Sequence, residues 1–285
     1  MSQLATVGDA LAAARAVTMQ AGSALSTASA QALLAHVLGK GRAWLLAHRE
    51  EALPPADAER YQALLARAAD GEPLPHLLGE REFYGMAFTV TPDVLIPRPE
   101  TEALVDAVRA WAAEHPRPQP RIVDVGTGSG AVAIAVAAHL PEACVTAVEV
   151  SGAAVSVARG NAQRHNLAAR ISFVQGDLLL ALAGPFDVIA ANLPYINRDE
   201  IAALDVGRWE PWVALDGGPD GLYLVRRLLA QAPSRLAAGG LLVLEIGYDQ
   251  GERTVALCQR AFPAANVTLR PDLAGLDRIV SVQLP

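Results

Sequence analysis

The spacing of apolar positions divides the chain into a helical part and a part in which strands and helices alternate. Up to about residue 75, apolar side chains recur at helical intervals, as at Val7, Leu11, Ala14 and Val17 and again over residues 30–38. Residues 26–27 and the run PPAD at 54–57 are typical of helix starts. The pattern therefore predicts a small helical bundle over residues 1–75.

Residues 80–94 differ from the bundle because they are rich in aromatic and β-branched side chains. The run REFYGMAFTVTPDV, with Gly85 at a turn position, predicts a β-hairpin, which we expect to link two domains over residues 76–97. A helix through Val108 and Trp111 follows, and the proline-rich stretch 115–120 ends it.

From Arg121 onward, short apolar runs alternate with helical stretches. Strands are expected at 121–125, 144–150, 171–175, 186–193 and 241–246, and helices at 131–140, 153–165, 221–236 and 251–261, before two extended runs at 267–270 and 278–284. This alternation is typical of a parallel sheet with helices on both faces. The predicted fold class is α/β, with a doubly wound domain over residues 98–285.

Composition and charge narrow the function classes. The chain of 285 residues carries 23 basic and 30 acidic side chains, a formal charge of −7, which argues against a protein that coats nucleic acid. No apolar run reaches the roughly 18 residues of a membrane span, and the N-terminus has no basic signal region, so we expect a cytoplasmic protein. Cys144 and Cys258 are expected to be inert core thiols, and the six histidines show no metal-ligand spacing.

A glycine-rich loop follows the first predicted strand of this domain and opens a helix. The run DVGTGSG at 124–130 allows a tight turn and close approach of a ligand to the backbone. Nineteen residues later, Glu149 ends the next strand, where a carboxylate can accept hydrogen bonds from both ribose hydroxyls. The spacing also satisfies the dinucleotide pattern G-x-G-x-x-A, and a purely structural turn is the remaining alternative. The candidate cofactor residues here are Asp124, Gly126, Thr127, Gly128, Ser129, Gly130 and Glu149.

Two features favour S-adenosyl-L-methionine over a nicotinamide cofactor. Asp124 stands two residues before the first glycine, where its carboxylate can face a charged amino-acid end, and a third glycine falls at Gly130. The following strand ends at Asp177 and Leu178, which can hold the amino group and the face of an adenine. A plain turn role for Asp177 fits this evidence equally well.

Asn192-Leu193-Pro194-Tyr195 comes directly after a buried strand, at the carboxyl edge where such sheets bind ligands. An amide nitrogen is a poor nucleophile, so an enzyme that methylates one must orient its NH₂ group by accepting its hydrogens. The Asn192 side-chain oxygen and the Leu193 carbonyl are suitable acceptors, and Pro194 rigidifies the loop. Tyr195 can offer a π face to substrate and cation. The alternative is a strand-end asparagine followed by a proline turn.

Together, these motifs resemble the amino methyltransferases with an (N/D)PPY signature. Three further segments, EREFYG (80–85), LIPRPETE (95–102) and EPWVALDGGPDGL (210–222), extend the resemblance over the whole chain to the HemK/PrmC family, the release factor glutamine methyltransferases. The resemblance implies a class I methyltransferase fold behind a helical substrate-docking domain. It also implies N5-methylation of the glutamine in the Gly-Gly-Gln motif of class I peptide chain release factors, with S-adenosyl-L-homocysteine as product. Asn192 and Tyr195 would be catalytic, 192–195 would hold the glutamine, and Asn192 would also touch the cofactor.

The chain departs from the family pattern at two positions. Leu193 replaces the usual first proline, which predicts a looser loop, and Leu178 replaces a common aromatic residue, which weakens stacking on adenine. Arg98 is expected to pair with a carboxylate, either of the cofactor or of a neighbouring acid. Phe83 and Tyr84 fit either the wall of the substrate mouth or a packing role.

Other functions remain open at the level of sequence. Within the signature they are a ribosomal-protein glutamine methyltransferase and a nucleic-acid adenine methyltransferase, although the net charge and the lack of a Lys/Arg-rich stripe argue against the second. From other classes they are a nicotinamide oxidoreductase and a noncatalytic binding module. We expect no metal, no membrane partner and no direct nucleic-acid partner.

Overall fold

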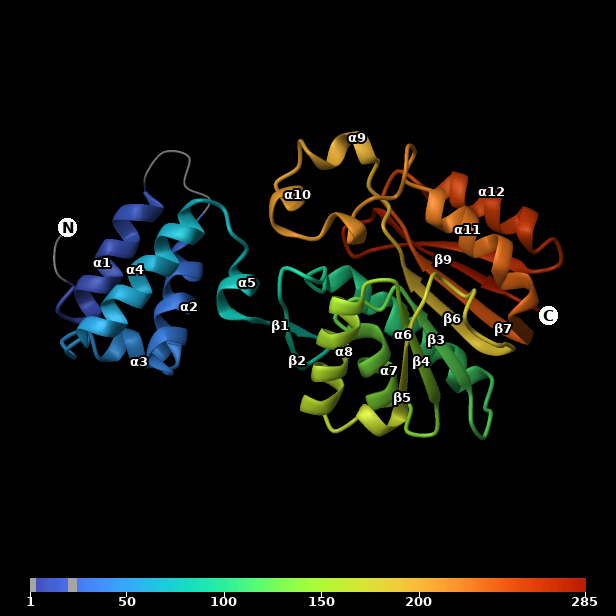
Figure 1. Ribbon diagram of the computed structural model, residues 1–285, viewed down its shortest axis with the longest axis horizontal. Helices are drawn as coiled ribbons and strands as arrows, with labels where there is room; N and C mark the ends of the chain where they lie inside the picture. The colour runs from blue at the N-terminus through green and yellow to red at the C-terminus, as the bar shows by residue number, and fades with distance from the viewer. Residues whose placement is uncertain (1–3, 20–24) are drawn as a thin grey trace. The chain divides into compact units, whose positions relative to one another are not determined.

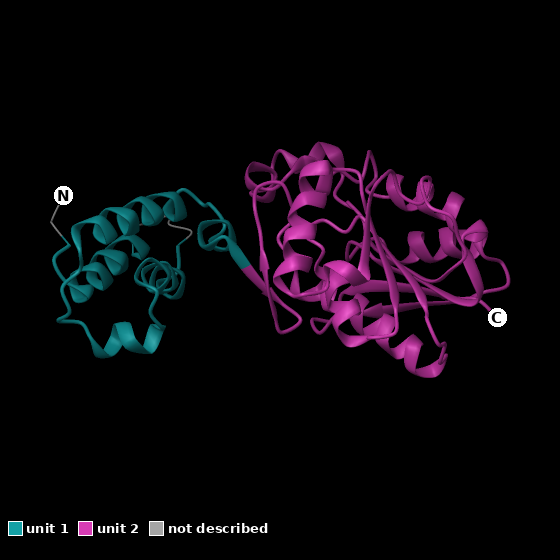
Figure 2. Ribbon diagram, turned by 60° about the horizontal axis from the view of Figure 1, so that its bottom comes forward, with its two compact units in different colours: residues 1–80 teal, residues 81–285 magenta. Residues whose placement is uncertain are grey.

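The computed structural model describes residues 4–19 and 25–285. The chain forms two compact units, residues 1–80 and 81–285, which Figure 2 shows in different colours. Within the described residues, no helix is both long enough and apolar enough to cross a bilayer.

The first unit consists of helices, as the apolar spacing predicts. They are α1 (Val7–Thr18), α2 (Thr27–Leu38), α3 (Arg42–Ala47), α4 (Pro55–Ala69) and α5 (Leu74–Leu78). Ser26 is the N-cap of α2 and accepts a hydrogen bond from the Ser29 amide at 3.0 Å. In the centre, the buried Tyr61 hydroxyl donates to the Ala30 carbonyl at 3.1 Å, which ties α4 to α2.

The predicted hairpin consists of β1 (Glu80–Phe83) and β2 (Met86–Thr89) and, apart from Glu80, belongs to the second unit. Tyr84 and Gly85 form the turn, both with positive φ. Phe83 and Phe88 are fully buried in one cluster with residues of α6 (Glu102–Glu114) and α7 (Ala131–His139), so the hairpin packs on the second unit's core. The Tyr84 hydroxyl donates to Asp106 of α6 at 2.6 Å.

A sheet of seven strands forms the centre of the second unit (Figure 1). Its order is β5-β4-β3-β6-β7-β9-β8, and the first five strands are parallel. Because β4 and β6 lie on opposite sides of β3, the strand order reverses between β3 and β6, the position at which such sheets bind ligands. The strands are β3 (Arg121–Val125), β4 (Cys144–Glu149), β5 (Ile171–Gln175), β6 (Phe186–Asn192), β7 (Leu236–Glu245), β8 (Asn266–Pro271) and β9 (Asp277–Gln283).

Helices cover both faces of this sheet, as expected for buried parallel strands. Alternate residues of β6 illustrate the division: Val188 and Ala190 pack in the cluster with α6 and α7, whereas Ile189 and Ala191 pack in the cluster with α11 (Tyr223–Gln231) and α12 (Gly251–Ala261). Helix α8 (Gly152–Arg164) lies with α7 on the first face.

Three details of the sequence prediction are wrong. The sheet is mixed, because β9 runs antiparallel to β7 and β8 antiparallel to β9. The expected helix 221–236 ends at Gln231, where a 3₁₀ turn containing Pro233 follows, and β7 begins already at Leu236. Cys144 is exposed rather than buried, because it is the first residue of β4 and lies at the amino end of that strand. Cys258 is buried, as expected.

Candidate active site

The glycine loop connects β3 to α7 in a conformation that requires glycine. Gly126, Gly128 and Gly130 have φ of 76°, 53° and 85°. A Cβ on Gly130 would lie 3.0 Å from Ile134 Cδ1 and 3.1 Å from Ala158 Cβ, so this position also permits close packing of α7 on α8. The two intervening residues, Thr127 and Ser129, are buried.

Asp124 is 3% exposed and lies beneath this loop. Its Oδ2 accepts hydrogen bonds from the Thr127 hydroxyl at 2.5 Å and from the Ala133 amide, in the first turn of α7, at 3.1 Å. Burial raises the pKa of its carboxyl to about 6, and the two hydrogen bonds oppose that shift. Asp124 therefore joins the loop to the helix, and it also lines a small cavity of about 50 Å³ beside Asn192.

Glu149 ends β4 next to the loop. Its carboxylate accepts from the Gly128 amide and from the Ser151 amide, both at 3.0 Å. This places the carboxylate and the second glycine side by side at the carboxyl edge of the sheet. Val150 follows, half exposed, and lines a second, larger cavity of about 330 Å³.

Asp177 and Leu178 follow β5 on the same edge. Asp177 forms an ion pair with Arg227 of α11. Leu178 has a φ of 52° and is buried in the core cluster with its side chain at the cavity wall. The Asp177 carboxylate, which was expected to hold the amino group of an adenine, is therefore paired with the guanidinium of Arg227. The sequence did not predict this ion pair.

The Asn192-to-Tyr195 segment leaves β6 and is held by contacts from outside the motif. Leu193 is 4% exposed and packs in the core cluster, and the looser loop expected at this position stays a prediction. The next residue of the chain, Ile196, pairs with Asp216 in a parallel bridge, with hydrogen bonds of 3.1 Å from its amide and 2.8 Å to its carbonyl.

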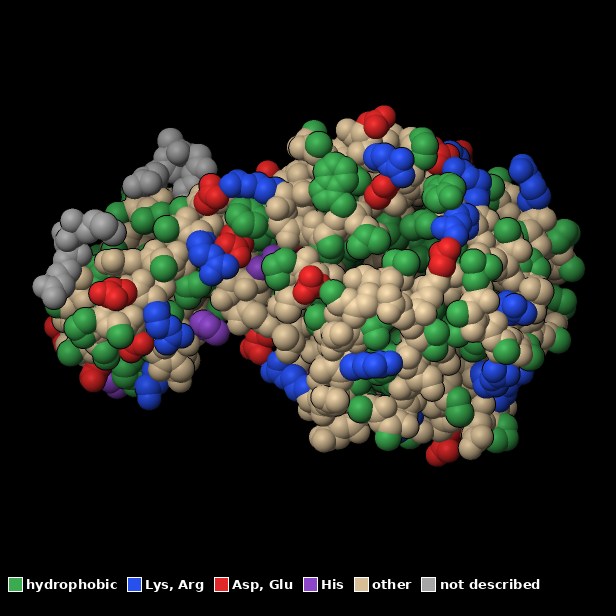
Figure 3. All heavy atoms as spheres, viewed as in Figure 1, with side chains coloured by type: hydrophobic (Ala, Val, Ile, Leu, Met, Phe, Trp, Pro, Cys, Tyr) green, Lys and Arg blue, Asp and Glu red, His purple; other side chains and the backbone are tan. Residues whose placement is uncertain are grey.

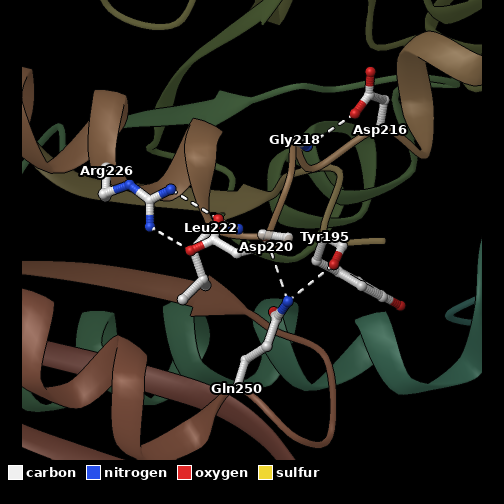
Figure 4. A network of polar contacts seen from close by, with 8 residues as sticks. Tyr195, Asp216, Gly218, Asp220, Leu222, Arg226 and Gln250 are labelled. Atoms are coloured by element: carbon white, nitrogen blue, oxygen red, sulfur yellow. Dashed lines mark hydrogen bonds and ion pairs between the residues drawn. The ribbon is translucent and has the colours of Figure 1, made fainter. Parts of the chain in front are cut away.

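Gln250 is 3% exposed, and its side-chain amide holds the backbone at the end of the motif (Figure 4). Its side-chain nitrogen donates to the Tyr195 carbonyl at 2.9 Å and to the Gly221 carbonyl at 3.4 Å. The carbonyl of Tyr195, not its ring, faces Gln250 in this view. A buried amide thus fixes the backbone at the end of the motif to the 216–222 loop.

The ring of Tyr195 does not contribute to the cavity lining, in which the motif's described residues stop at Pro194. Burial raises the pKa of its phenol, and the nearby Glu245 raises it further, whereas Arg278 and Arg98 lower it. Tyr195 is therefore outside the described cavity wall, and its predicted contact with substrate stays a prediction.

A cavity of about 330 Å³ brings most of the predicted site residues together. This volume lies at the small end of the range typical of ligand pockets. The predicted residues in its wall are Gly126, Gly128, Glu149, Asp177, Leu178, Asn192, Leu193 and Pro194. Thr127, Ser129 and Asp124 line the smaller cavity beside it, and Gly130 supports the loop from below.

Charge in the larger cavity is unequally distributed. Its described wall contains four carboxylates, of Asp93, Glu149, Asp177 and Asp216, and two guanidiniums. Both guanidiniums are paired, Arg198 with Asp216 at 2.8 Å and Arg227 with Asp177. The excess of carboxylates favours a cationic ligand and disfavours the pyrophosphate of a dinucleotide.

Behind Asn192 lie two polar residues that sequence reasoning missed. The Asn192 side-chain nitrogen donates to the Thr101 hydroxyl at 3.0 Å, and Glu245 of β7 is the register partner of Asn192 on β6. Glu245 is 2% exposed, and burial raises its pKa to about 7. The signal available in the sequence was an acidic residue at the end of the otherwise apolar run LLVLEI.

A second buried acid, Glu210, binds the segment that precedes α6. Arg98 forms an ion pair with Glu210, which also accepts from the Ile96 amide at 2.8 Å. The carboxylate partner of Arg98 is thus a neighbouring acid of the chain. Phe83 and Tyr84 are absent from the cavity wall and serve packing and hydrogen bonding instead. Within the described residues, no group of acidic, histidine or cysteine side chains is arranged to hold a metal.

Comparison with known proteins adds independent evidence. The family model of the PrmC N-terminal domain matches residues 9–79, and that of the methyltransferase small domain matches residues 101–206. The chain is 45% identical over 254 residues to the release factor glutamine methyltransferase of Bordetella pertussis, covering 88% of this chain and 92% of that protein. It is 42% identical over 279 residues to that of Cereibacter sphaeroides, covering 97% and 98%.

Solved structures agree on the fold. A ribosomal protein L11 methylase from Lactobacillus delbrueckii subsp. bulgaricus matches with a TM-score of 0.50 at 20% identity, over 69% of this chain and 84% of that one. The hMettl16 catalytic domain matches with a TM-score of 0.56 at 16% identity, over 80% and 84%. At these identities the likeness concerns the fold alone, and it confirms the predicted class I methyltransferase architecture. Because the chain is 45% and 42% identical to these two relatives over most of both sequences, it belongs to the family of release factor glutamine methyltransferases.

Proposed function

We propose that this protein transfers a methyl group from S-adenosyl-L-methionine to the side-chain nitrogen of the glutamine in the Gly-Gly-Gln motif of class I peptide chain release factors. The observation that carries the proposal is the position of Asn192 and Leu193 in one cavity with Gly126, Gly128 and Glu149. The amide-binding motif and the nucleoside-binding loop thus face the same space.

The residues present fit S-adenosyl-L-methionine. Glu149 would accept from the ribose hydroxyls, Val150 and Leu178 would offer apolar surfaces to the base, and the unbalanced carboxylates suit a positive charge. When bound, this cofactor supplies an electrophilic methyl group on a sulfonium. Asp124 is engaged by Thr127 and Ala133, so we expect it to act by holding the loop and to face the amino-acid end only through the small cavity.

The chain's contribution to the reaction is the orientation of a weak nucleophile. The Asn192 side-chain oxygen and the Leu193 carbonyl accept the two amide hydrogens of the glutamine, which turns the nitrogen lone pair towards the methyl donor. As the nitrogen–carbon bond forms, the sulfur–carbon bond would break, with S-adenosyl-L-homocysteine as the leaving group, and the amide proton would be lost late to solvent. Catalysis then comes from positioning and from acceptance of the positive charge that develops on the N–H groups.

The surface suits a protein partner better than a nucleic acid. The net charge is −7, and on the face shown in Figure 3 Lys and Arg side chains are interspersed with Asp and Glu rather than gathered into a stripe. We propose that the first unit, residues 1–80, docks the release factor and that the enzyme works in the cytoplasm.

The decisive experiment incubates the purified protein with labelled S-adenosyl-L-methionine and an unmethylated release factor, and then localises the label by mass spectrometry. We expect one methyl group on the Gly-Gly-Gln glutamine and none when that glutamine is replaced by alanine. Parallel reactions with ribosomal protein and with adenine-containing RNA and DNA test the other substrates of the signature. Transfer to one of these, with none to the release factor, would overturn the proposal.

A further inference from the structure

The turn that follows β5, residues 177–179, is held by one side of helix α11. The Arg227 guanidinium donates from Nη2 to Asp177 Oδ2. The Gln231 side-chain oxygen accepts from the Leu179 amide at 2.9 Å. Because Arg227 and Gln231 are four residues apart, they lie on the same side of the helix. The two contacts therefore attach the turn to α11 at points one helical turn apart.

The turn needs this attachment because its backbone is unfavourable. Leu178 has a φ of 52°, in the left-handed region that a residue with a Cβ rarely adopts. Such a conformation persists only where the surrounding structure holds it. Asp177 and Leu178 both line the cavity of about 330 Å³, so the contacts that hold the turn also place two residues of the cavity wall.

The ion pair uses only part of the Asp177 carboxylate. Its Oδ2 is paired with Arg227, whereas its Oδ1 has no partner among the described residues, and the side chain is 42% exposed. Oδ1 is therefore available to accept a hydrogen bond from a ligand in the cavity.

Arg227 is also held from its other side. Its guanidinium carbon lies 5.5 Å from the ring centroid of Tyr223, which precedes it by one helical turn and lines the same cavity. With Tyr223 on one side and Asp177 on the other, the guanidinium has a fixed place, and the carboxylate that it binds is hindered from rotating.

A carboxylate oxygen with a fixed direction distinguishes between purines. The 6-amino group of adenine donates hydrogen bonds, whereas a 6-oxo group accepts them. A carboxylate can only accept, so it binds the first group and leaves the second without a donor. A carboxylate that rotates freely is less selective, because it can turn away from a 6-oxo group towards solvent.

We infer that Arg227 is a positioning residue of the cofactor site. It fixes one oxygen of Asp177 so that the other meets the 6-amino group of the adenine, and it thereby makes the site select a 6-amino over a 6-oxo purine. The inference rests on the proposed cofactor, S-adenosyl-L-methionine. It assigns a role to helix α11, which lies outside the glycine loop and the N-x-P-Y motif.

The test measures binding by calorimetry and needs no methyl transfer. Dissociation constants are determined for S-adenosyl-L-homocysteine and for S-inosyl-L-homocysteine, in which hypoxanthine replaces adenine. We expect the wild type to prefer the adenosyl ligand by about tenfold or more, the equivalent of one hydrogen bond. If the wild type binds neither ligand, the proposed cofactor itself fails. If it binds both equally, the cofactor stands and the inference fails.

Three substitutions then test the positioning role. Arg227→Met keeps a long side chain but cannot pair with Asp177, and we expect the preference to fall about threefold, the effect of a half-exposed ion pair. Asp177→Asn can donate as well as accept, so we expect it to bind both ligands about equally. In the Asp177→Asn background, Arg227→Met should not change the preference further, because Arg227 acts through Asp177. Arg226→Met is the matched control, since the neighbouring Arg226 pairs with Asp220 at 2.9 and 2.8 Å outside the described cavity wall (Figure 4).

Every pattern of results decides the question. A reduced preference in Arg227→Met, with no change in Arg226→Met and no added effect in the double variant, supports the inference. Equal weakening of both ligands, or unchanged binding, in Arg227→Met would reduce Arg227 to a structural residue and overturn it. Tighter binding of S-adenosyl-L-homocysteine would show that Arg227 competes with the adenine for Asp177, and a further loss in the double variant would show that Arg227 contacts the base itself; both results also overturn it. Thermal melting confirms that each variant is folded.

Discussion

Asp124→Asn gives a sharp prediction about pH and stability, because the carboxyl is buried and its pKa is raised from 3.8 to about 6. Its protonated form is favoured in the folded state, so between pH 4 and pH 6 the folded protein binds more protons than the unfolded chain. Stability must then fall as the pH rises through this window and level off above it. A shift of about two pKa units at about 1.4 kcal/mol each amounts to about 3 kcal/mol.

The assay is urea unfolding of wild type and Asp124→Asn at several pH values. Tryptophan fluorescence reports on the second unit alone in a Trp44→Phe background, since the other three tryptophans lie within residues 81–285. We expect the difference in unfolding free energy, wild type minus variant, to decrease by about 2–3 kcal/mol from pH 4 to pH 7, because at pH 4 the unfolded carboxyl is already partly ionised. The titration of Glu245 occurs in both proteins and cancels.

Thr127→Val provides an internal check. The Thr127 hydroxyl lowers the pKa of Asp124, so its removal should move the fall in stability to higher pH. The assignment of Asp124 as a buried, proton-binding carboxyl would be refuted by either of two results. One is a pair of stability curves for wild type and Asp124→Asn that run parallel across this pH range, and the other is a difference in unfolding free energy, wild type minus variant, that grows with pH.

Three further substitutions test the site and the loop. Asn192→Ala should lower turnover by about 10²-fold or more with an unchanged melting temperature, because a preorganised acceptor is lost; near-normal turnover would contradict its role. Glu149→Ala should raise the dissociation constant for S-adenosyl-L-homocysteine about tenfold or more in calorimetry, since it removes both an acceptor and the contact that holds Gly128. Gly130→Ala should destabilise the second unit by about 1–3 kcal/mol in urea unfolding, because its φ is 85° and Ile134 Cδ1 would lie 3.0 Å from the new Cβ; an unchanged midpoint would show that the helices readjust freely.

The sequence predicted those parts of the molecule that depend on local pattern. Apolar spacing located every long helix and the five parallel strands, and the glycine loop and the strand-end asparagine identified the correct edge of the sheet, because both follow buried strands directly. Strand direction at the C-terminus was not predictable in this way, since β8 and β9 have the same alternation in either direction.

The site features that the sequence did not predict depend on contacts between segments that are far apart in the chain. The pairing of Asp177 with Arg227 and the position of Glu245 behind Asn192 join residues that are 50 and 53 positions apart in the chain. Neither has a local signature beyond a charged residue at the end of an apolar strand. Tyr195 shows the same limit: the three motif residues before it line the cavity, whereas Tyr195 itself does not.

The way the N-x-P-Y segment is anchored has a consequence for how such a motif can vary. Its backbone is held by the pairing of Ile196 with Asp216 and by the buried Gln250, neither of which belongs to the motif. The Leu193 side chain meanwhile lies against the loop at Gly126, so the first position of the motif is used for packing between two loops. The backbone contacts that hold the segment thus come from residues 20 and 55 positions beyond it, and a change at Asp216 or Gln250 would reach the motif without altering any of its four residues.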